Sequence, residues 1–484
     1  MSLIQPFVAH VDFGDVTKRQ VKLVHQSVRE FVIGPWALDR PSSSLAISAP
    51  SASLQAPMQQ RTERLEAGIL AICIRYLLLH EINNVGLFSE ECLALEELPQ
   101  DPDLFNDNGV PNNYDPYCSW EAWEQNMIHY DPTERGFGEL FVYASCHWIE
   151  HFGAISAKPL LPSLNDIELL CGAGSTRLHN WIAQNCRPDC AIKPRFVFDS
   201  TLYDPLSITS LYGSETMLYR MLEDSDLDGN TFLPSPVMGA ADQILQWGDL
   251  PRLRLLWESK AGRQICNVGF FRLMLKQWSK RPSDKHRQGW DVVFSLLDDV
   301  YDMMAEEQWG STLLSMAAEI GCMPVIRRLM DAAQHQPRLR TELLDMPQSG
   351  YGLIGAAVLG NHADVVEYLL GQQGIEAHLQ RRNACGENVL HLASRLCNPA
   401  IFRLLVPRLK DSVYQRDRQG DTVLIRIIMS SSASRDRCES ARILLSEVGA
   451  GNGGRFLDDQ QEALRIATGL CDLDMCRLFD NEGR

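Results

Sequence analysis

The chain has 484 residues and carries 45 basic and 62 acidic side chains, which gives a formal net charge of −17. This length exceeds a single ordinary hydrophobic core and predicts about two to four folded units, while 45% hydrophobic and 22% charged residues are typical of a soluble globular protein. The excess of acidic residues disfavours direct binding to nucleic acid or acidic membranes. No apolar run reaches the roughly 18 residues that a transmembrane helix needs.

The first 60 residues predict an extended segment, a helix and a linker. A short alternating strand begins near Arg19, and a helix is expected at residues 26–32, so that residues 1–36 form one small segment. Residues 37–60 are rich in Ser, Pro and Ala, a composition that predicts a flexible linker.

Residues 61–195 predict a helical spacer domain. Its first helix is expected to begin at Thr62, a residue type that caps helices, followed by apolar residues at helical spacing. Further helices are expected at residues 138–155, 165–172 and 175–186, and the acidic stretch 95–116 is expected to be a loop.

From about residue 200 the sequence repeats a pattern of two short apolar helices separated by a small residue. Four segments align on that break: GSTLLSMAAEIGCMPVIRRLM from Gly310, GYGLIGAAVLGNHADVVEYLL from Gly350, GENVLHLASRLCNPAIFRLLV from Gly386 and QEALRIATGLCDLDMCRLF from Gln461. The break positions are Gly321, Gly360, Cys397 and Cys471, at spacings of 39, 37 and 74 residues. The last spacing holds one more repeat, from Gly420, with about eight inserted residues, SSSASRDR. Two upstream segments, from Asp204 and Asp228, also fit the pattern.

This pattern resembles the ankyrin repeat, in which Gly-x-Thr-Pro-Leu-His-x-Ala-Ala leads to a Gly and a second helix. The resemblance covers residues 200–484, with about five to seven degenerate repeats. It implies an all-α fold in which the helical spacer domain precedes an ankyrin-repeat solenoid. No repeat buries its apolar second helix alone, so neighbouring repeats must stack.

Polar residues recur where the first helix of each repeat should begin. Thr312, Asn388 and Thr422 stand where a side-chain oxygen can cap that helix. In the ankyrin family the histidine of the repeat bonds near the helix start and joins neighbouring loops, and the resemblance implies this structural role for His391. A metal site at His391 with Cys385 or Cys397 is the disfavoured alternative.

Two other stretches contain residue types found in zinc sites. HWIEH, from His147 to His151, matches His-x-x-Glu-His, which on a helix places two histidines beside a glutamate as in some zinc hydrolases. The competing interpretation is an amphipathic helix with Trp148 packed inward. Four further residues lack the usual zinc-binding spacing: Cys171, His179, Cys186 and Cys190. The chain has no Gly-Lys pair and therefore no phosphate loop, so we expect no catalytic residue, no metal, no nucleotide and no cofactor.

Three stretches of the front half resemble fungal NACHT–ankyrin proteins of the STAND class. VKLVHQSVREFV resembles the winged-helix-like segment that closes their nucleotide-binding module, AGILAICIRYLLL their Cys-x-x-Tyr-Leu helix, and FVYASCHWIEHF their Tyr-Ala-x-x-x-Trp-x-x-His helix. By this resemblance His25 corresponds to a histidine that contacts the nucleotide phosphate. The NACHT NTPase module precedes this segment in the family and is missing from the sequence, so ATP switching is not expected here.

The repeats predict a non-catalytic interaction scaffold or regulatory adaptor, plausibly a transcriptional co-regulator whose protein partner is a transcription factor. The alternatives are the detached sensor half of a fungal STAND self/non-self recognition system and a zinc hydrolase at His147 and His151. Ankyrin arrays bind proteins through first helices and hairpin tips, where the candidate contact residues are Glu319, Ile320, Val358, Leu359, Arg395, Leu396 and, at a hairpin tip, Arg418. The fourteen cysteines form no disulfide framework, so we expect an intracellular protein, in the cytoplasm or the nucleus.

Residues 403–442 are rich in arginine, including Arg416, Arg418, Arg435 and Arg437. These side chains are expected either to be solvated in loops between repeats or to form a local patch for an acidic protein partner.

Overall fold

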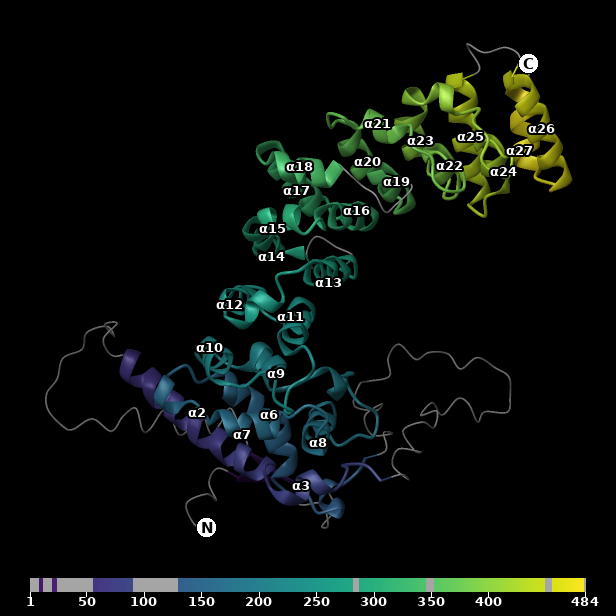
Figure 1. Cartoon of the computed structure of the whole chain (residues 1–484). Helices are drawn as coiled ribbons and strands as arrows, with labels where there is room; N and C mark the ends of the chain where they lie inside the picture. The colour runs from purple at the N-terminus through teal and green to yellow at the C-terminus, as the bar shows by residue number, and fades with distance from the viewer. Residues whose placement is uncertain are drawn as a thin grey trace, which may run out of the picture. The chain divides into compact units, whose positions relative to one another are not determined.

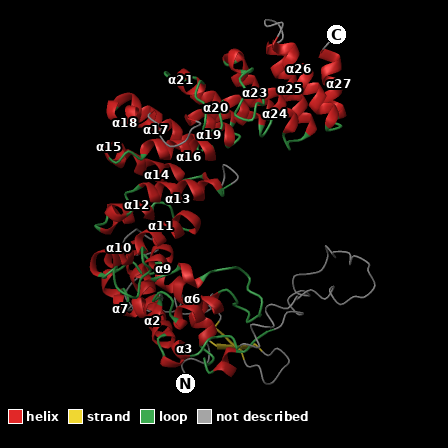
Figure 2. Cartoon of the chain, turned by 45° about the vertical axis from the view of Figure 1, so that its right-hand side comes forward, coloured by secondary structure: helices red, strands yellow, loops and turns green. Residues whose placement is uncertain are grey.

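The computed structural model describes residues 8–11, 20–23, 55–89, 129–281, 287–344, 352–448 and 455–482. The predicted all-α fold is confirmed, because helices dominate the described residues (Figure 2). A single antiparallel ribbon accompanies them, in which β1 (Val8–Val11) pairs with β2 (Gln20–Leu23), the strand expected near Arg19. The helix predicted at residues 26–32, His25 and the acidic loop 95–116 lie outside the described residues. None of the described helices is long and apolar enough to cross a membrane.

The chain divides into two compact units, residues 1–265 and 266–484. The predicted start of the array, residue 200, therefore lies inside the first unit. The α-helices of this unit are α2 (Gln55–Leu77), α3 (His80–Asn84), α6 (Phe141–Gly153), α7 (Leu164–Leu170), α8 (Thr176–Asn185), α9 (Pro205–Tyr212), α10 (Glu215–Asp224), α11 (Pro236–Trp247) and α12 (Arg252–Glu258). Its 3₁₀ turns are η4 (Pro132–Arg135), η5 (Lys158–Leu160), η6 (Ser200–Leu202) and η7 (Ala261–Gln264).

The start of α2 differs from the prediction. The helix begins at Gln55, so Thr62 lies inside it and does not cap it, and the last residues of the predicted linker are helical. The extra turns contain Ala, Met, Gln and Arg, which favour helix. Pro57 falls in the first turn, where a missing N–H costs little.

The core of the first unit forms around α6, which packs against α2 and α8. Trp148 of α6 is completely buried, as expected for an amphipathic helix, and meets Trp181 of α8 edge-on with 5.1 Å between ring centroids. Later in the unit, Asp204 caps α9 by accepting the N–H of Ser207 at 2.7 Å and also accepts the N–H of Leu233 at 3.2 Å. One buried carboxylate therefore joins the two upstream segments of the repeat pattern.

The second unit is a stack of helix pairs (Figure 1). Its α-helices are α13 (Val268–Ser279), α14 (Trp290–Phe294), α15 (Tyr301–Glu306), α16 (Gly310–Ile320), α17 (Met323–His335), α18 (Pro337–Leu344), α19 (Gly352–Leu359), α20 (Ala363–Leu370), α21 (Glu376–Leu379), α22 (Val389–Ser394), α23 (Pro399–Leu405), α24 (Val423–Met429), α25 (Ser434–Val448), α26 (Arg455–Gly469) and α27 (Leu473–Glu482). Its 3₁₀ turns are η9 (Ser295–Val300), η10 (Val406–Arg408) and η11 (Lys410–Ser412). First helices pack in the order α16, α19, α22, α24 and α26, and second helices in the order α20, α23, α25 and α27.

The turns between first and second helices contain residues in the left-handed backbone region. These residues are Gly321 (φ 79°), Asn361 (φ 64°), Cys397 (φ 49°) and Cys471 (φ 56°). At the second break Gly360 is needed for a different reason, because a Cβ atom on it would lie 1.9 Å from the carbonyl oxygen of Glu319 in the preceding repeat. Close stacking of repeats therefore depends on the absence of a side chain at Gly360.

Candidate protein-binding surface of the repeats

His391 joins two neighbouring repeats. Asn388 caps α22, because its Oδ1 atom accepts the N–H groups of Leu390 at 3.0 Å and His391 at 3.1 Å. The His391 ring is completely buried, and its Nε2 atom lies 3.2 Å from the carbonyl oxygen of Asp421 in the next loop. Burial lowers the pKa of His391, which favours the neutral ring. A neutral ring with its proton on Nε2 donates that proton to the Asp421 carbonyl.

The two other expected caps differ from the prediction. Thr312 lies inside α16, which begins at Gly310, and the N–H of Ser311 donates to Glu342 Oε1 at 2.8 Å. A distant carboxylate therefore performs the capping function. Thr422 does stand at the N-cap of α24, but its hydroxyl makes no capping bond and is buried without a partner among the residues that the structure describes.

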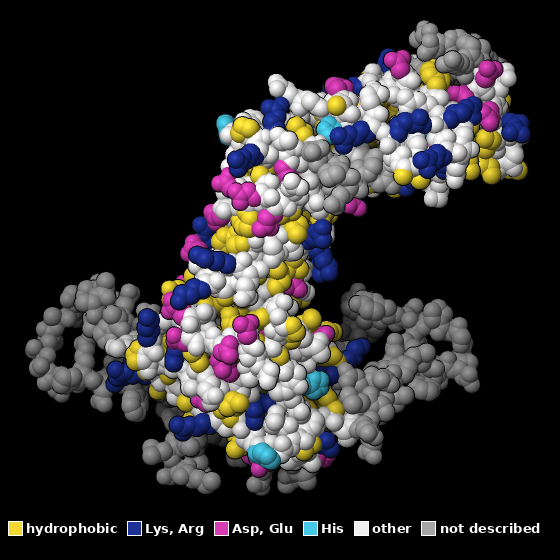
Figure 3. All heavy atoms as spheres, viewed as in Figure 1, with side chains coloured by type: hydrophobic (Ala, Val, Ile, Leu, Met, Phe, Trp, Pro, Cys, Tyr) yellow, Lys and Arg dark blue, Asp and Glu magenta, His cyan; other side chains and the backbone are white. Residues whose placement is uncertain are grey.

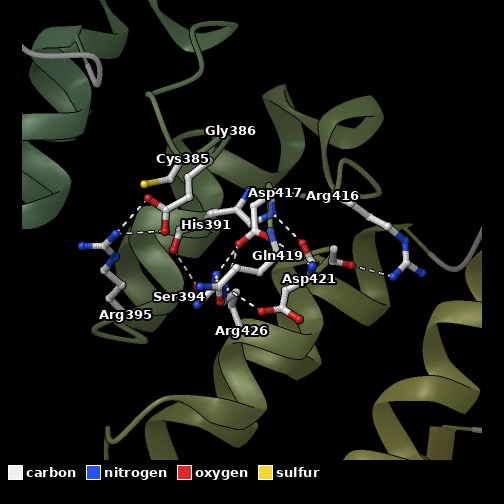
Figure 4. A network of polar contacts seen from close by, with 12 residues as sticks. Cys385, Gly386, His391, Ser394, Arg395, Arg416, Asp417, Gln419, Asp421 and Arg426 are labelled. Atoms are coloured by element: carbon white, nitrogen blue, oxygen red, sulfur yellow. Dashed lines mark hydrogen bonds and ion pairs between the residues drawn. The ribbon is translucent and has the colours of Figure 1, made fainter.

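The loop before α24 is held instead by the buried carboxylate of Asp417 (Figure 4). Its Oδ1 atom accepts the N–H groups of Gln419 at 2.8 Å and Asp421 at 3.1 Å, and its Oδ2 atom accepts from Arg426 Nε at 2.9 Å. Burial alone would raise the pKa of Asp417, but the bonds from Arg426 and the backbone outweigh burial and lower it. The carboxylate is therefore charged, and it fixes both the loop and α24.

The preceding loop repeats this arrangement. Asn383 Oδ1 accepts the N–H groups of Cys385 and Glu387, both at 2.9 Å. The buried carboxylate of Glu387 pairs with Arg395 at 2.8 Å. The two loops also bond directly, since the N–H of Arg418 donates to the carbonyl of Cys385 at 2.9 Å. Successive hairpin loops therefore form one rigid row.

The predicted contact residues differ in exposure. Glu319, Arg395, Leu396 and Arg418 are exposed, Ile320 and Leu359 are half-buried, and Val358 is completely buried. The expected exposure of Val358 is wrong, because α19 is apolar on all sides and packs against α16, α20 and α22. Arg395 presents only part of its side chain, since its guanidinium is bound to Glu387.

Three exposed apolar side chains of this unit, Met429, Leu470 and Leu473, are absent from the predicted set. Leu470 is 58% exposed and Met429 is 57% exposed, against 41% for Leu396. Leu470 directly precedes the break at Cys471, as Leu396 precedes the break at Cys397, so the same alignment contains the signal for it. Met429 is harder to place from the sequence because its repeat carries the insertion.

The HWIEH stretch does not leave its second histidine available for a metal. His151 is buried, its Nδ1 atom lies 2.6 Å from Glu66 Oε2, and its Nε2 atom lies 3.0 Å from the hydroxyl of Tyr143. The other histidine, His147, is 3.3 Å from Glu150. Both ring nitrogens of His151 thus have protein partners, Tyr143 within α6 and Glu66, which links α6 to α2.

The other residues considered as metal ligands do not converge. Within the described ranges, no three His, Cys, Asp or Glu side chains are arranged to hold a metal ion. Cys385 is exposed, whereas Cys397 is buried and its thiol donates to the carbonyl of Ser394 at 3.0 Å. His179 lies 3.1 Å from the hydroxyl of Ser200.

Comparison with known protein families identifies the repeats. The family model described as ankyrin repeats (3 copies) matches residues 353–455. These residues are ankyrin repeats. The match covers about a fifth of the chain and includes the His391 and Asp417 loops. No curated protein sequence and no solved structure matches the chain. Ankyrin repeats generally bind other proteins without catalysis, and no enzyme family is indicated.

Proposed function

We propose that the chain is a non-catalytic adaptor that binds a partner protein through its ankyrin repeats. The observation that carries this proposal is the rigid row of hairpin loops in residues 353–455, from which Arg418 remains exposed. Leu396 adds an exposed apolar side chain at the other end of α22. A surface whose loops are already ordered loses little conformational entropy when it binds. Glu319, half-buried Ile320 and half-buried Leu359 extend this candidate contact surface along the first helices.

Within this class, a regulatory adaptor whose partner is a transcription factor fits the charge best. The net charge of −17 repels DNA, but it favours encounter with a basic protein segment such as those that contact DNA. The adaptor would then act on transcription without touching nucleic acid. A location in the cytoplasm or the nucleus is consistent with this role.

A second candidate is a sensor derived from a fungal STAND recognition system. One observation favours it: the residues that carry the front-half resemblance occupy defined places in α6, where Trp148 is buried and His151 bonds Tyr143. In this role the repeats would bind the molecule to be recognised, and an NTPase partner would supply the response.

Affinity purification of the tagged full-length chain, with mass spectrometry, tests both candidates. Glu319→Lys with Arg418→Glu reverses two exposed charges of the candidate surface without changing the net charge. The matched control is Glu367→Lys with Arg338→Glu, two exposed positions on α20 and α18.

Recovery of a transcription factor that is lost only from the Glu319 and Arg418 variant supports the co-regulator. Recovery of an NTPase or a cell-death effector supports the sensor instead. Partners that both double variants retain equally would contradict binding through this surface.

A further inference from the structure

The ends of the first helices that lie away from the hairpin loops form a second continuous surface. We define the turn edge as residues 395–398, 429–434 and 470–474, the turns that lead into α23, α25 and α27. Neighbouring turns are bonded to each other: Ser430 Oγ donates to the carbonyl of Arg395 at 3.0 Å, and Ser434 Oγ donates to Asp474 Oδ2 at 2.8 Å. An ion pair between Arg437 and Asp472, at 2.8 Å, joins the same two turns.

An open groove of about 1130 Å³ lies beside the turn edge. Four arginines from the second helices of three successive repeats line it: Arg403 of α23, Arg435 and Arg442 of α25, and Arg477 of α27. Figure 3 shows lysine and arginine side chains on the viewed face of the C-terminal repeats. The groove is therefore shared by three repeats and is not a feature of one loop.

The insertion in the repeat from Gly420 helps to build this groove. Residues 430–437 contain the inserted SSSASRDR, and Ser434, Arg435 and Asp436 of this stretch line the groove. The insertion is anchored, because the hydroxyls of Ser430 and Ser432 both donate to the carbonyl of Arg395, at 3.0 and 3.3 Å. Residues 430–437 thus form one ordered side of the groove.

Positive charge exceeds negative charge among the lining residues. The acidic members are Asp436, Glu439 and Asp474, against four arginines. Glu439 lies between two guanidinium groups, 2.8 Å from Arg403 and 2.5 Å from Arg442, so it neutralises only one of them. Arg477 pairs with Asp474 at 3.7 Å, and the lining residues therefore carry an excess of one positive charge. Arg435 makes no ion pair or hydrogen bond with the residues that the structure describes. A local positive excess in a chain of net charge −17 is an electrostatic attractor for anionic groups.

Apolar side chains accompany this charge along the turn edge. Leu396, Met429, Leu470 and Leu473 are all exposed. Leu473 directly precedes Asp474 of the groove, and Leu396 stands two residues before Asn398 of the groove. Exposed apolar residues beside a charged groove are typical of a protein-binding site.

We propose that this groove binds an acidic peptide segment of a partner protein, one that also carries large apolar side chains. Guanidinium groups bind carboxylates in a two-pronged geometry, and the exposed leucines and Met429 would cover the apolar side chains of the peptide. A nucleic acid would meet the same arginines but would be repelled by the remaining acidic surface. The groove arginines lie beside the turns and not in the hairpin row that contains Arg418, whereas Leu396 belongs both to the turn edge and to the surface proposed above, so the two surfaces adjoin at the end of α22.

Fluorescence anisotropy on the full-length protein tests the site. The probe is a labelled synthetic peptide of about twelve Glu, Asp and Leu residues, a length typical of linear recognition motifs. Its uncharged analogue contains Gln and Asn in place of the acids. The variant Arg435→Gln with Arg477→Gln removes two exposed charges of the groove. The matched control is Arg272→Gln with Arg338→Gln, which removes two exposed charges elsewhere in the unit.

The acidic peptide should bind more tightly than its uncharged analogue, and its affinity should fall as salt is raised. The groove variant should weaken binding roughly tenfold, at about threefold per exposed arginine, and the control should not change it. Equal affinity for both peptides, or equal loss in both double variants, would overturn the proposal.

Two further binding measurements distinguish a peptide site in the groove from a nucleic-acid site and from a peptide site on the first helices. A single-stranded RNA oligonucleotide that binds more tightly than the peptide, and loses binding in the groove variant, would assign the groove to nucleic acid and overturn the peptide proposal. The variant Glu319→Lys with Arg418→Glu should keep peptide binding. Loss of peptide binding in that variant would place the peptide on the first-helix surface, which overturns the second site but leaves the proposed adaptor function standing.

Discussion

Replacing Asp417 with alanine removes the centre of the hairpin network. The Asp417 side chain is only 1% exposed and accepts bonds from two backbone N–H groups and from Arg426. Alanine leaves the N–H groups of Gln419 and Asp421 without their acceptor. It also leaves the guanidinium of Arg426 without its best-placed counter-charge.

The size of the effect follows from what Arg426 retains. Loss of one partner of a buried ion pair costs about 3–5 kcal/mol of unfolding free energy. The Arg426 side chain is 26% exposed and keeps contacts with Asp421 at 3.2 Å and Gln419 at 3.0 Å, so we expect the lower end, about 3 kcal/mol. Asp417→Asn retains an oxygen acceptor for the backbone and should cost about half as much.

Urea unfolding followed by circular dichroism measures this effect. With a urea dependence of about 1–3 kcal/mol per M, a loss of ~3 kcal/mol lowers the midpoint of the affected transition by at least about 1 M. The control is Asp411→Ala, which removes an exposed carboxylate from the neighbouring 3₁₀ turn and should change stability by less than about 0.5 kcal/mol. Equal midpoints for the Asp417 and Asp411 variants would refute the assignment of Asp417 as the organiser of this loop.

Three other substitutions test the stacking of the repeats. Gly360→Ala should lower the melting temperature by the equivalent of about 2 kcal/mol or more, because its Cβ would lie 1.9 Å from the carbonyl oxygen of Glu319; an unchanged calorimetric transition would contradict this contact. Cys471→Gly should raise stability by about 0.5–1 kcal/mol, since glycine tolerates φ 56° without strain, and a lower urea midpoint would argue against a strained turn. His391 has a pKa lowered by burial, so the unfolded chain binds more protons below its usual pKa of about 6.5. The stability that the neutral ring contributes is therefore present above about pH 6.5 and is lost as the pH falls, and the wild type should lose more stability than His391→Gln between about pH 7.5 and 5; parallel pH profiles would exclude His391 as the source.

Features set by local chemistry could be predicted from the sequence. Asn388 caps its helix as its residue type suggests, because the acceptor and the N–H groups lie within three residues of one another. Four turns between helices also fall at the aligned breaks or one residue from them, and each contains a left-handed residue: Gly321, Asn361, Cys397 and Cys471. Because the repeats follow one another in the sequence, the order in which their helices pack could also be predicted.

Features set by long-range contacts could not be predicted in this way. The start of α16 is satisfied by Glu342, which is 31 residues from Ser311, so the local pattern at Thr312 points to the wrong cap. Val358 looks like an exposed position by analogy with other repeats, but its helix packs against α16, α20, α21 and α22. In both cases the deciding atoms come from another helix.

The arginines of the last repeats illustrate how pairing determines what a surface can bind. Arg416 is held by Asp459 at 2.8 Å and Glu462 at 3.0 Å, and Arg437 is held by Asp472. These guanidiniums connect repeats, so replacing them would alter stability and binding together. Arg418, in a hairpin loop, and Arg435, on α25 beside the turn edge, are exposed and have no charge partner among the described residues. Substitutions at these two positions can therefore separate binding at the hairpin row from binding at the turn edge without loosening the stack.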